Sequence, residues 1–106
     1  MLFRSVLDKK RAAQMPDVPT VAEAGMPELI STTWFAIAAP PKLPHALQQQ
    51  IASAMIEVVK MPDVQQKFRN VGIEPVGNTP AEMEAFVKDE ARRWGEVIKA
   101  NHISLD

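Results

Sequence analysis

Nine prolines punctuate this 106-residue chain and restrict where helices can form. Proline lacks a backbone N–H and pushes the residue before it toward extended geometry, so it is excluded from helix interiors. Met15–Pro19 therefore cannot lie inside a helix. The length suits one domain or part of one, with little stability to spare. Hydrophobic residues make up 46% and charged residues 24%, which is typical of a folded chain rather than a disordered one.

Apolar periodicity predicts a helix over residues 44–60. Its apolar residues recur at spacings of three and four and form one stripe, which consists of Leu47, Ile51, Ala54, Met55 and Val58. Pro62 at a first-turn position opens a second helix over residues 62–70. Gly72 is its expected stop.

Two capping boxes are present. In the first, the Thr20 hydroxyl can accept from the Glu23 amide while the Glu23 side chain reaches back, and Gly25 suits a left-handed cap. This pattern predicts a single helical turn between two loops. The second box, Thr79–Glu82, has proline at the first helical position and opens a helix to about residue 100, where Asn101 can end it. The apolar stripe of that helix consists of Met83, Phe86, Val87, Trp94, Val97 and Ile98.

Residues 30–39 read as a strand because they are rich in β-branched and aromatic side chains. Apolar residues on both faces indicate a strand covered on both sides, as in an α/β sheet, and Pro40-Pro41 ends it. Ile73–Val76 is a candidate for a short strand, bent or placed at an edge by Pro75. Val6-Leu7 fits the end of another strand.

The sequence lacks the residues that several classes of function require. The absence of cysteine excludes disulfides, thiolate zinc sites and cysteine nucleophiles. His45 and His102 lie on distant segments without a carboxylate at a ligand spacing, which favours surface histidines over a metal or acid–base role. The sequence holds no nucleophile elbow and no phosphate-cradling glycine loop. We therefore expect no enzyme activity, no cofactor and no metal ligand.

Charge and hydropathy limit the kinds of partner that the chain can bind. Twelve Lys and Arg against thirteen Asp and Glu leave no basic excess for nucleic acid. The short cluster Lys9–Arg11 favours a solvated loop over a phosphate site. Asp89, Glu90, Arg92, Arg93 and Glu96 read as a solvated helix face with local ion pairs. No apolar run approaches the roughly 20 residues that span a bilayer, so direct membrane insertion is not expected.

Trp34 and Phe35 are the candidate ligand contacts. Neighbours in a strand point to opposite faces, so at most one of them is expected to reach a ligand. The favoured alternative is that both belong to a core. Trp94 and Phe86 lie on an apolar helix stripe and are expected to be packing residues.

The segment Met15–Gly25, with Lys10-Arg11 before it, resembles a family signature. The family comprises the extracytoplasmic solute receptors of tripartite tricarboxylate transporters, the Bug or TctC-like proteins. Further matches follow in order along the chain, at Thr33–Pro40, Pro62–Val64, Gly72–Gly77, Thr79–Glu82 and Trp94. The resemblance covers roughly residues 6–104, whereas Met1–Ser5 departs from the pattern. We therefore expect the C-terminal part of a longer receptor.

The resemblance implies an α/β fold, the C-terminal part of a type II periplasmic binding protein, helix-rich with one crossing strand and short strands. Residues 1–30 would end the second domain, residues 31–40 would form the crossing strand or hinge, and residues 41–106 would supply the C-terminal helices of the first domain. The ligand would lie in the cleft between the two domains.

The same resemblance implies a periplasmic receptor that captures a small carboxylate and delivers it to the membrane subunits of the transporter. In that family, glycine- and serine-containing loops that precede this region hold the carboxylate, so Trp34 and Phe35 are the positions placed beside the cleft here. The chain alone is expected to bind poorly or not at all. The alternative is a small helical interaction module that folds alone without a ligand. An exposed apolar patch would favour the receptor part over the module.

Overall fold

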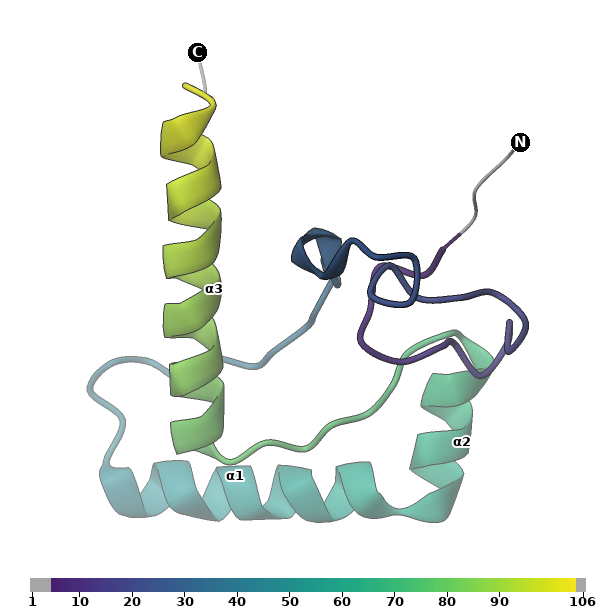
Figure 1. Cartoon of the computed structure of the whole chain (residues 1–106). Helices are drawn as coiled ribbons and strands as arrows, with labels where there is room; N and C mark the ends of the chain where they lie inside the picture. The colour runs from purple at the N-terminus through teal and green to yellow at the C-terminus, as the bar shows by residue number, and fades with distance from the viewer. Residues whose placement is uncertain (1–4, 105–106) are drawn as a thin grey trace. The chain divides into compact units, whose positions relative to one another are not determined.

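The chain consists of two units, Met1–Ala38 and Ala39–Asp106, in a computed structural model that describes residues 5–104 (Figure 1). The first unit contains loops, turns and the short 3₁₀ helix η1, Pro27–Leu29. The second contains the α-helices α1, His45–Lys60, α2, Pro62–Asn70, and α3, Pro80–Ala100. All three predicted helices are confirmed, with ends within a residue of those expected.

In the first unit, two distant segments join through an isolated parallel bridge between Val6 and Thr20. The Val6 N–H donates to the Pro19 carbonyl at 2.8 Å, and the Val21 N–H donates to the Val6 carbonyl at 2.9 Å. Val21 is 1% exposed and Thr20 is 2% exposed, and they are the only buried residues within 5–104. The core of this unit therefore consists of the Val21 side chain and the turn that begins at Thr20.

A proline sets the corner between α1 and α2. Met61 ends α1 and precedes α2, with φ −64° and ψ 131°. These extended angles follow from Pro62, whose ring disfavours helical geometry in the residue before it. Pro62 then occupies a first-turn position of α2, where its missing N–H costs nothing. The two helices contact each other.

The ends of α2 and α3 follow the same hydrogen-bonding pattern. After α2, Gly72 has φ +78°, and the Ile73 N–H donates to the Phe68 carbonyl at 2.9 Å. After α3, the Ile103 N–H donates to the Ile98 carbonyl at 3.1 Å, and the left-handed position is taken by His102 at φ 51°. Both are Schellman endings, which normally place glycine at that position.

The helix α3 is stabilised locally. The predicted capping box is confirmed: the Glu82 N–H donates to Thr79 Oγ1 at 3.3 Å, and the Thr79 N–H donates to Glu82 Oε2 at 2.8 Å. The predicted charged face is also confirmed, since Arg92 pairs with Asp89 at 2.7 Å and with Glu96 at 3.1 Å. Arg93 pairs with Glu90 at 3.0 Å. Ion pairs as exposed as those of Arg92 contribute little to stability, because solvent screens them.

The predicted strands are not formed. Within residues 5–104, residues 30–39 and Ile73–Val76 belong to no sheet, and Val6 makes a single bridge rather than a strand. A strand exists only where a neighbouring strand supplies the ladder of hydrogen bonds, whereas a helix satisfies its own backbone. The crossing strand and the short strands are therefore not confirmed, whereas the helix-rich part of the prediction is confirmed, since residues 5–104 form helices joined by loops.

Candidate functional site

A connected set of hydrogen bonds surrounds Glu23. Arg11 Nη2 donates to Glu23 Oε1 at 2.8 Å, and Arg11 Nε donates to Oε2 at 3.0 Å. Arg11 Nη1 donates to the Pro16 carbonyl at 3.0 Å. The Thr20 N–H donates to Glu23 Oε2 at 2.8 Å, and the Glu23 N–H donates to Thr20 Oγ1 at 3.1 Å. The predicted capping box is confirmed, and Arg11 adds hydrogen bonds to its Glu23 carboxylate.

These donors change the acidity of Glu23. The hydrogen bonds from Arg11, and after them the one from the Thr20 N–H, lower the pKa of the Glu23 carboxyl from 4.5 to about 2. Both contacts favour the charged form, which accepts hydrogen bonds that a neutral carboxyl would lose. Glu23 is therefore ionised at any physiological pH.

The polar cluster is suited to holding a loop rather than to chemistry. All three nitrogens of the Arg11 guanidinium donate within the chain, and the Glu23 carboxylate balances its charge, which disfavours the binding of a second anion there. The Glu23 carboxylate is too acidic for a general base near neutrality. The turn that follows ends at Gly25, φ +83°, with the Met26 N–H donating to the Val21 carbonyl at 2.9 Å.

Trp34 and Phe35 lie in the segment predicted to be a strand. Trp34 is 42% exposed and Phe35 is 82% exposed, so neither belongs to a core of this chain. Ile37 in the same segment is 76% exposed. This apolar segment is therefore exposed to solvent, although its composition is typical of a strand covered on both faces of a sheet.

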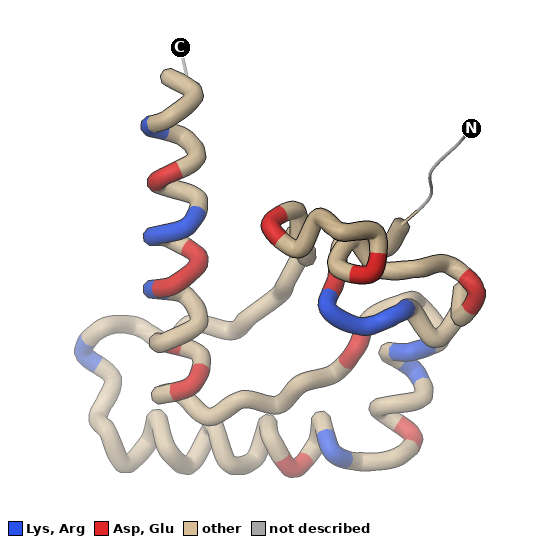
Figure 2. Tube along the Cα trace, in the orientation of Figure 1, with Lys and Arg blue, Asp and Glu red and all other residues tan. Residues whose placement is uncertain are grey.

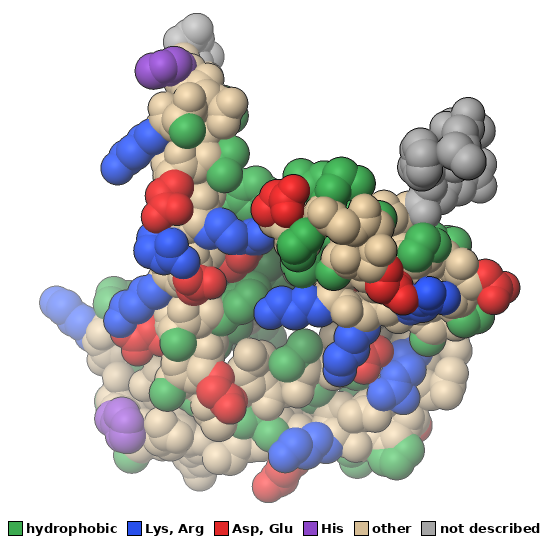
Figure 3. All heavy atoms as spheres, in the orientation of Figure 1, with side chains coloured by type: hydrophobic (Ala, Val, Ile, Leu, Met, Phe, Trp, Pro, Cys, Tyr) green, Lys and Arg blue, Asp and Glu red, His purple; other side chains and the backbone are tan. Residues whose placement is uncertain are grey.

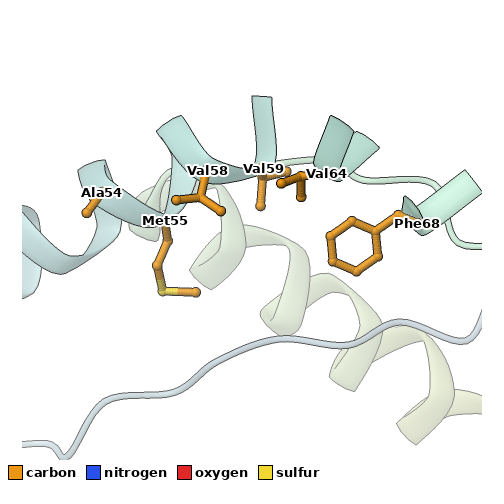
Figure 4. Close-up of a pocket in the computed structure, with 6 residues that line it drawn as sticks. All are labelled: Ala54, Met55, Val58, Val59, Val64 and Phe68. Atoms are coloured by element: carbon orange, nitrogen blue, oxygen red, sulfur yellow. The ribbon is translucent and has the colours of Figure 1, made fainter. Parts of the chain in front are cut away.

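A separate apolar hollow of about 380 Å³ lies between α1 and α2. Its side chains project to the same side of the two helices (Figure 4) and come from Ala54, Met55, Val58, Val59, Val64 and Phe68. Its wall offers almost no polar group to orient a small carboxylate.

The remaining predicted residues do not assemble into a site. His45 lies at the first position of α1, 3.4 Å from Gln49 Nε2, and His102 follows α3. In residues 5–104, no group of three or more His, Asp or Glu is placed to hold a metal ion. None of the helices described is long and apolar enough to cross a bilayer.

The role of Arg11 was missed from the sequence, where the cluster Lys9–Arg11 favours a solvated loop. Its side chain is 46% exposed, yet it is the main partner of Glu23. The two residues are twelve positions apart, and only the turn at Pro16 brings them together. Spacing carries no signal for such a contact, since it depends on the loop geometry and not on a helical or strand period.

Comparison with known proteins gives one consistent result. The family model described as "Tripartite tricarboxylate transporter family receptor" matches residues 2–103. Protein BugT of Bordetella pertussis is 34% identical in an alignment that covers 95% of this chain and 31% of that protein. A UPF0065 protein from the tcbD-tcbE intergenic region of Pseudomonas sp. (strain P51) is 32% identical over 83% of this chain and 26% of its own length.

A third relative is a UPF0065 protein from the TAR-I ttuE-ttuC' intergenic region of Agrobacterium vitis. It is 33% identical over 89% of this chain and 28% of its own length. The chain therefore spans less than a third of the length of each of these relatives.

Proposed function

Because this chain belongs to the tripartite tricarboxylate transporter receptor family, we propose that it is part of an extracytoplasmic receptor for a small carboxylate. The complete receptor works in the periplasm and delivers its ligand to the membrane subunits of the transporter. The observation that carries the proposal is the family match over residues 2–103, nearly the whole chain. Family membership also supports a binding role rather than an enzymatic one, and a periplasmic-binding-protein fold for the whole receptor.

We further propose that the chain is the C-terminal part of the receptor. Residues 1–30 end one domain, residues 31–40 connect the domains, and residues 41–106 contribute helices to the other. The relatives support a partial receptor, because the chain matches only 31% of BugT. The remaining part of the receptor is proposed to supply most ligand contacts.

Exposed apolar surface supports the receptor part over an interaction module that folds alone. Figure 3 shows hydrophobic side chains on the surface of the face in view. Exposed large residues include Phe35 at 82%, Ile37 at 76% and Val76 at 72%. A self-sufficient monomer rarely leaves contiguous apolar surface in water.

Trp34 and Phe35 are the proposed ligand-side residues of this chain. Phe35 is the most exposed of the large hydrophobic residues described, so it has the surface to offer a partner. Aromatic rings commonly line small-molecule clefts, where a few polar groups fix orientation. These two residues therefore supply shape, while the charge that binds the carboxylate comes from elsewhere in the receptor.

Ligand binding by two proteins tests the proposal. The first is the 106-residue chain, and the second is a chimaera in which this chain replaces the matched segment of BugT. Mono-, di- and tricarboxylates are screened by thermal shift and calorimetry. We expect no saturable binding by the chain alone. One carboxylate should raise the Tm of the chimaera by several degrees, since a ligand at about 100 times its Kd stabilises by about 2.7 kcal/mol.

Two results would contradict the proposal: tight one-to-one binding of a dicarboxylate by the chain alone, or a folded chimaera that no carboxylate stabilises. Phe35→Ala in the chimaera tests the ligand-side residues and should weaken binding about tenfold. The matched control is Val76→Ala, another highly exposed apolar residue, which lies in the second unit and should leave Kd within about twofold.

A further inference from the structure

The helix α1 is unusually poor in charge for a helix on a surface. Of its 16 residues only Glu57 and Lys60 are charged, and both lie in the last turn. The 21 residues of α3 include nine charged ones, namely Glu82, Glu84, Lys88, Asp89, Glu90, Arg92, Arg93, Glu96 and Lys99. Figure 2 shows this contrast along the two helices. Depletion of charge is typical of surfaces that become covered.

The apolar stripe predicted for α1 is present but uncovered. Leu47 is 42% exposed, Ile51 is 44% exposed and Val58 is 50% exposed. The stripe continues into the hollow that α2 completes with Val64 and Phe68 (Figure 4). We call this continuous region the α1–α2 apolar surface; it consists of Leu47, Ile51, Ala54, Met55, Val58, Val64 and Phe68.

We propose that the α1–α2 apolar surface is the docking site for the rest of a receptor chain of this family, the part that relatives have and this chain does not match. The relatives supply the argument, since the chain spans 31% of BugT and 26% and 28% of the next two. A polypeptide more than twice as long as this chain accompanies the matched segment in each of them. The inference rests on family membership and not on ligand binding.

The chemistry of the α1–α2 apolar surface indicates which kind of partner can bind there. The backbone of α1 and α2 is hydrogen-bonded within the helices, so the occupant contributes side chains and not a sheet edge. The two helices carry Lys60, Lys67 and Arg69 against Glu57 and Asp63, and this small basic excess disfavours an anionic membrane. A concave apolar hollow of about 380 Å³ accepts protruding aliphatic or aromatic side chains from a folded partner.

A charge placed on this surface tests the proposal. Val58→Asp puts a carboxylate on the stripe, and Ser53→Asp puts the same group on the opposite side of α1 as a matched control. Each substitution is made in the 106-residue chain and in the BugT chimaera. Helix content is followed by circular dichroism and Tm by thermal unfolding.

In the chain alone, we expect both variants to keep the parent helix content, because Val58 is half exposed. In the chimaera, Val58→Asp should lower Tm by about 5 °C or more, while Ser53→Asp shifts it by about 1 °C or less. Light scattering on the chain measures self-association. A dimer of the chain that Val58→Asp dissociates, together with a chimaera insensitive to it, would mean that the occupant is a second copy.

The proposal is overturned by equal Tm shifts for the two variants in the chimaera, or by a chimaera that stays unfolded while BugT folds. These results are separate from the test of ligand binding. A chimaera that folds, responds to Val58→Asp and binds no carboxylate would uphold the docking site and contradict the proposed function.

Discussion

The segment from Arg11 to Gly25 and the helix pair α1–α2 differ in what holds them. The segment closes on itself: Arg11 and Thr20 donate to Glu23, and Val21 beside them is 1% exposed. The helix pair has regular backbone hydrogen bonding but contains no buried residue. The first region is held by polar contacts within itself and by the bridge to Val6, whereas the second has an exposed apolar surface.

The comparison shows that a segment can have regular secondary structure without buried residues, and buried residues without regular secondary structure. A helix forms from its own hydrogen bonds, yet in proteins most of its stability comes from packing an apolar face. A loop without regular structure can be the better fixed region where a bidentate ion pair, a capping box and one buried side chain coincide. We therefore expect the loop to behave alike inside and outside the receptor, and the helices to change.

The largest expected difference comes from removing methyl groups in the two regions. Val21→Ala should destabilise the first unit by about 2 kcal/mol, because this side chain is fully buried. Val58→Ala in the chain alone should change stability by about 0.5 kcal/mol or less, since Val58 is half exposed and alanine is the better helix former. Amide hydrogen exchange in each region measures both effects. Equal costs would break the comparison.

Removal of a cap should have the next largest effect. Thr79→Ala deletes the hydroxyl that accepts from the Glu82 N–H, at a cost of about 1 kcal/mol to α3. Ser53→Ala in the interior of α1 is the control and should be neutral or slightly stabilising. Helix content at low urea concentrations separates the two variants. An unchanged α3 in Thr79→Ala would show that the capping box contributes little.

A substitution at the end of α3 should increase stability instead of lowering it. His102 occupies a left-handed conformation, φ 51°, that costs a residue with a side chain about 1 kcal/mol relative to glycine. His102→Gly should therefore slow exchange of the Ile103 amide, which donates to the Ile98 carbonyl. Ala100→Gly inside the helix is the contrasting variant and should speed it. Faster exchange in His102→Gly would refute the Schellman ending.

Acid should produce the smallest and most localised change. The folded-state pKa of Glu23, about 2, lies below its ordinary value of 4.5, so its contribution is complete above pH 4.5 and is lost as the pH falls toward 2. Because the ion pair is exposed, salt should weaken the effect. The protection factor of the Val21 amide, which corrects for the pH dependence of intrinsic exchange, should fall over this interval in the parent chain and not in Glu23→Gln. A protection factor that stays constant from pH 4.5 to 2 in the parent chain would contradict the assignment.

Much of the helical structure was predictable because its signals are local. Prolines at 44, 62 and 80, the box at Thr79 and the glycine at 72 fix the ends of three helices within a few residues of sequence. The left-handed His102 was missed because histidine is an uncommon choice there. The pairing of Arg11 with Glu23 was missed because a turn, and not a period, brings the two residues together.

The unconfirmed predictions concern structure that depends on neighbours. Residues 30–39 have strand composition, but a strand requires a second strand to pair with, and residues 5–104 do not supply one. The stripe on α1 was predicted correctly, whereas its exposure depends on what else packs there. The ligand contacts proposed for Trp34 and Phe35 stay a prediction, because a cleft is made by both of its walls.

Amide hydrogen exchange of the 106-residue chain and of the BugT chimaera, measured side by side, tests the central claim most directly. The account predicts that the Val21 and Gly25 amides exchange at the same rates in both proteins, while amides in the middle of α1 slow by about tenfold or more in the chimaera. If the amides of α1 exchange equally fast in both proteins, nothing covers the α1–α2 apolar surface, and the claim that this surface belongs inside a larger receptor is contradicted.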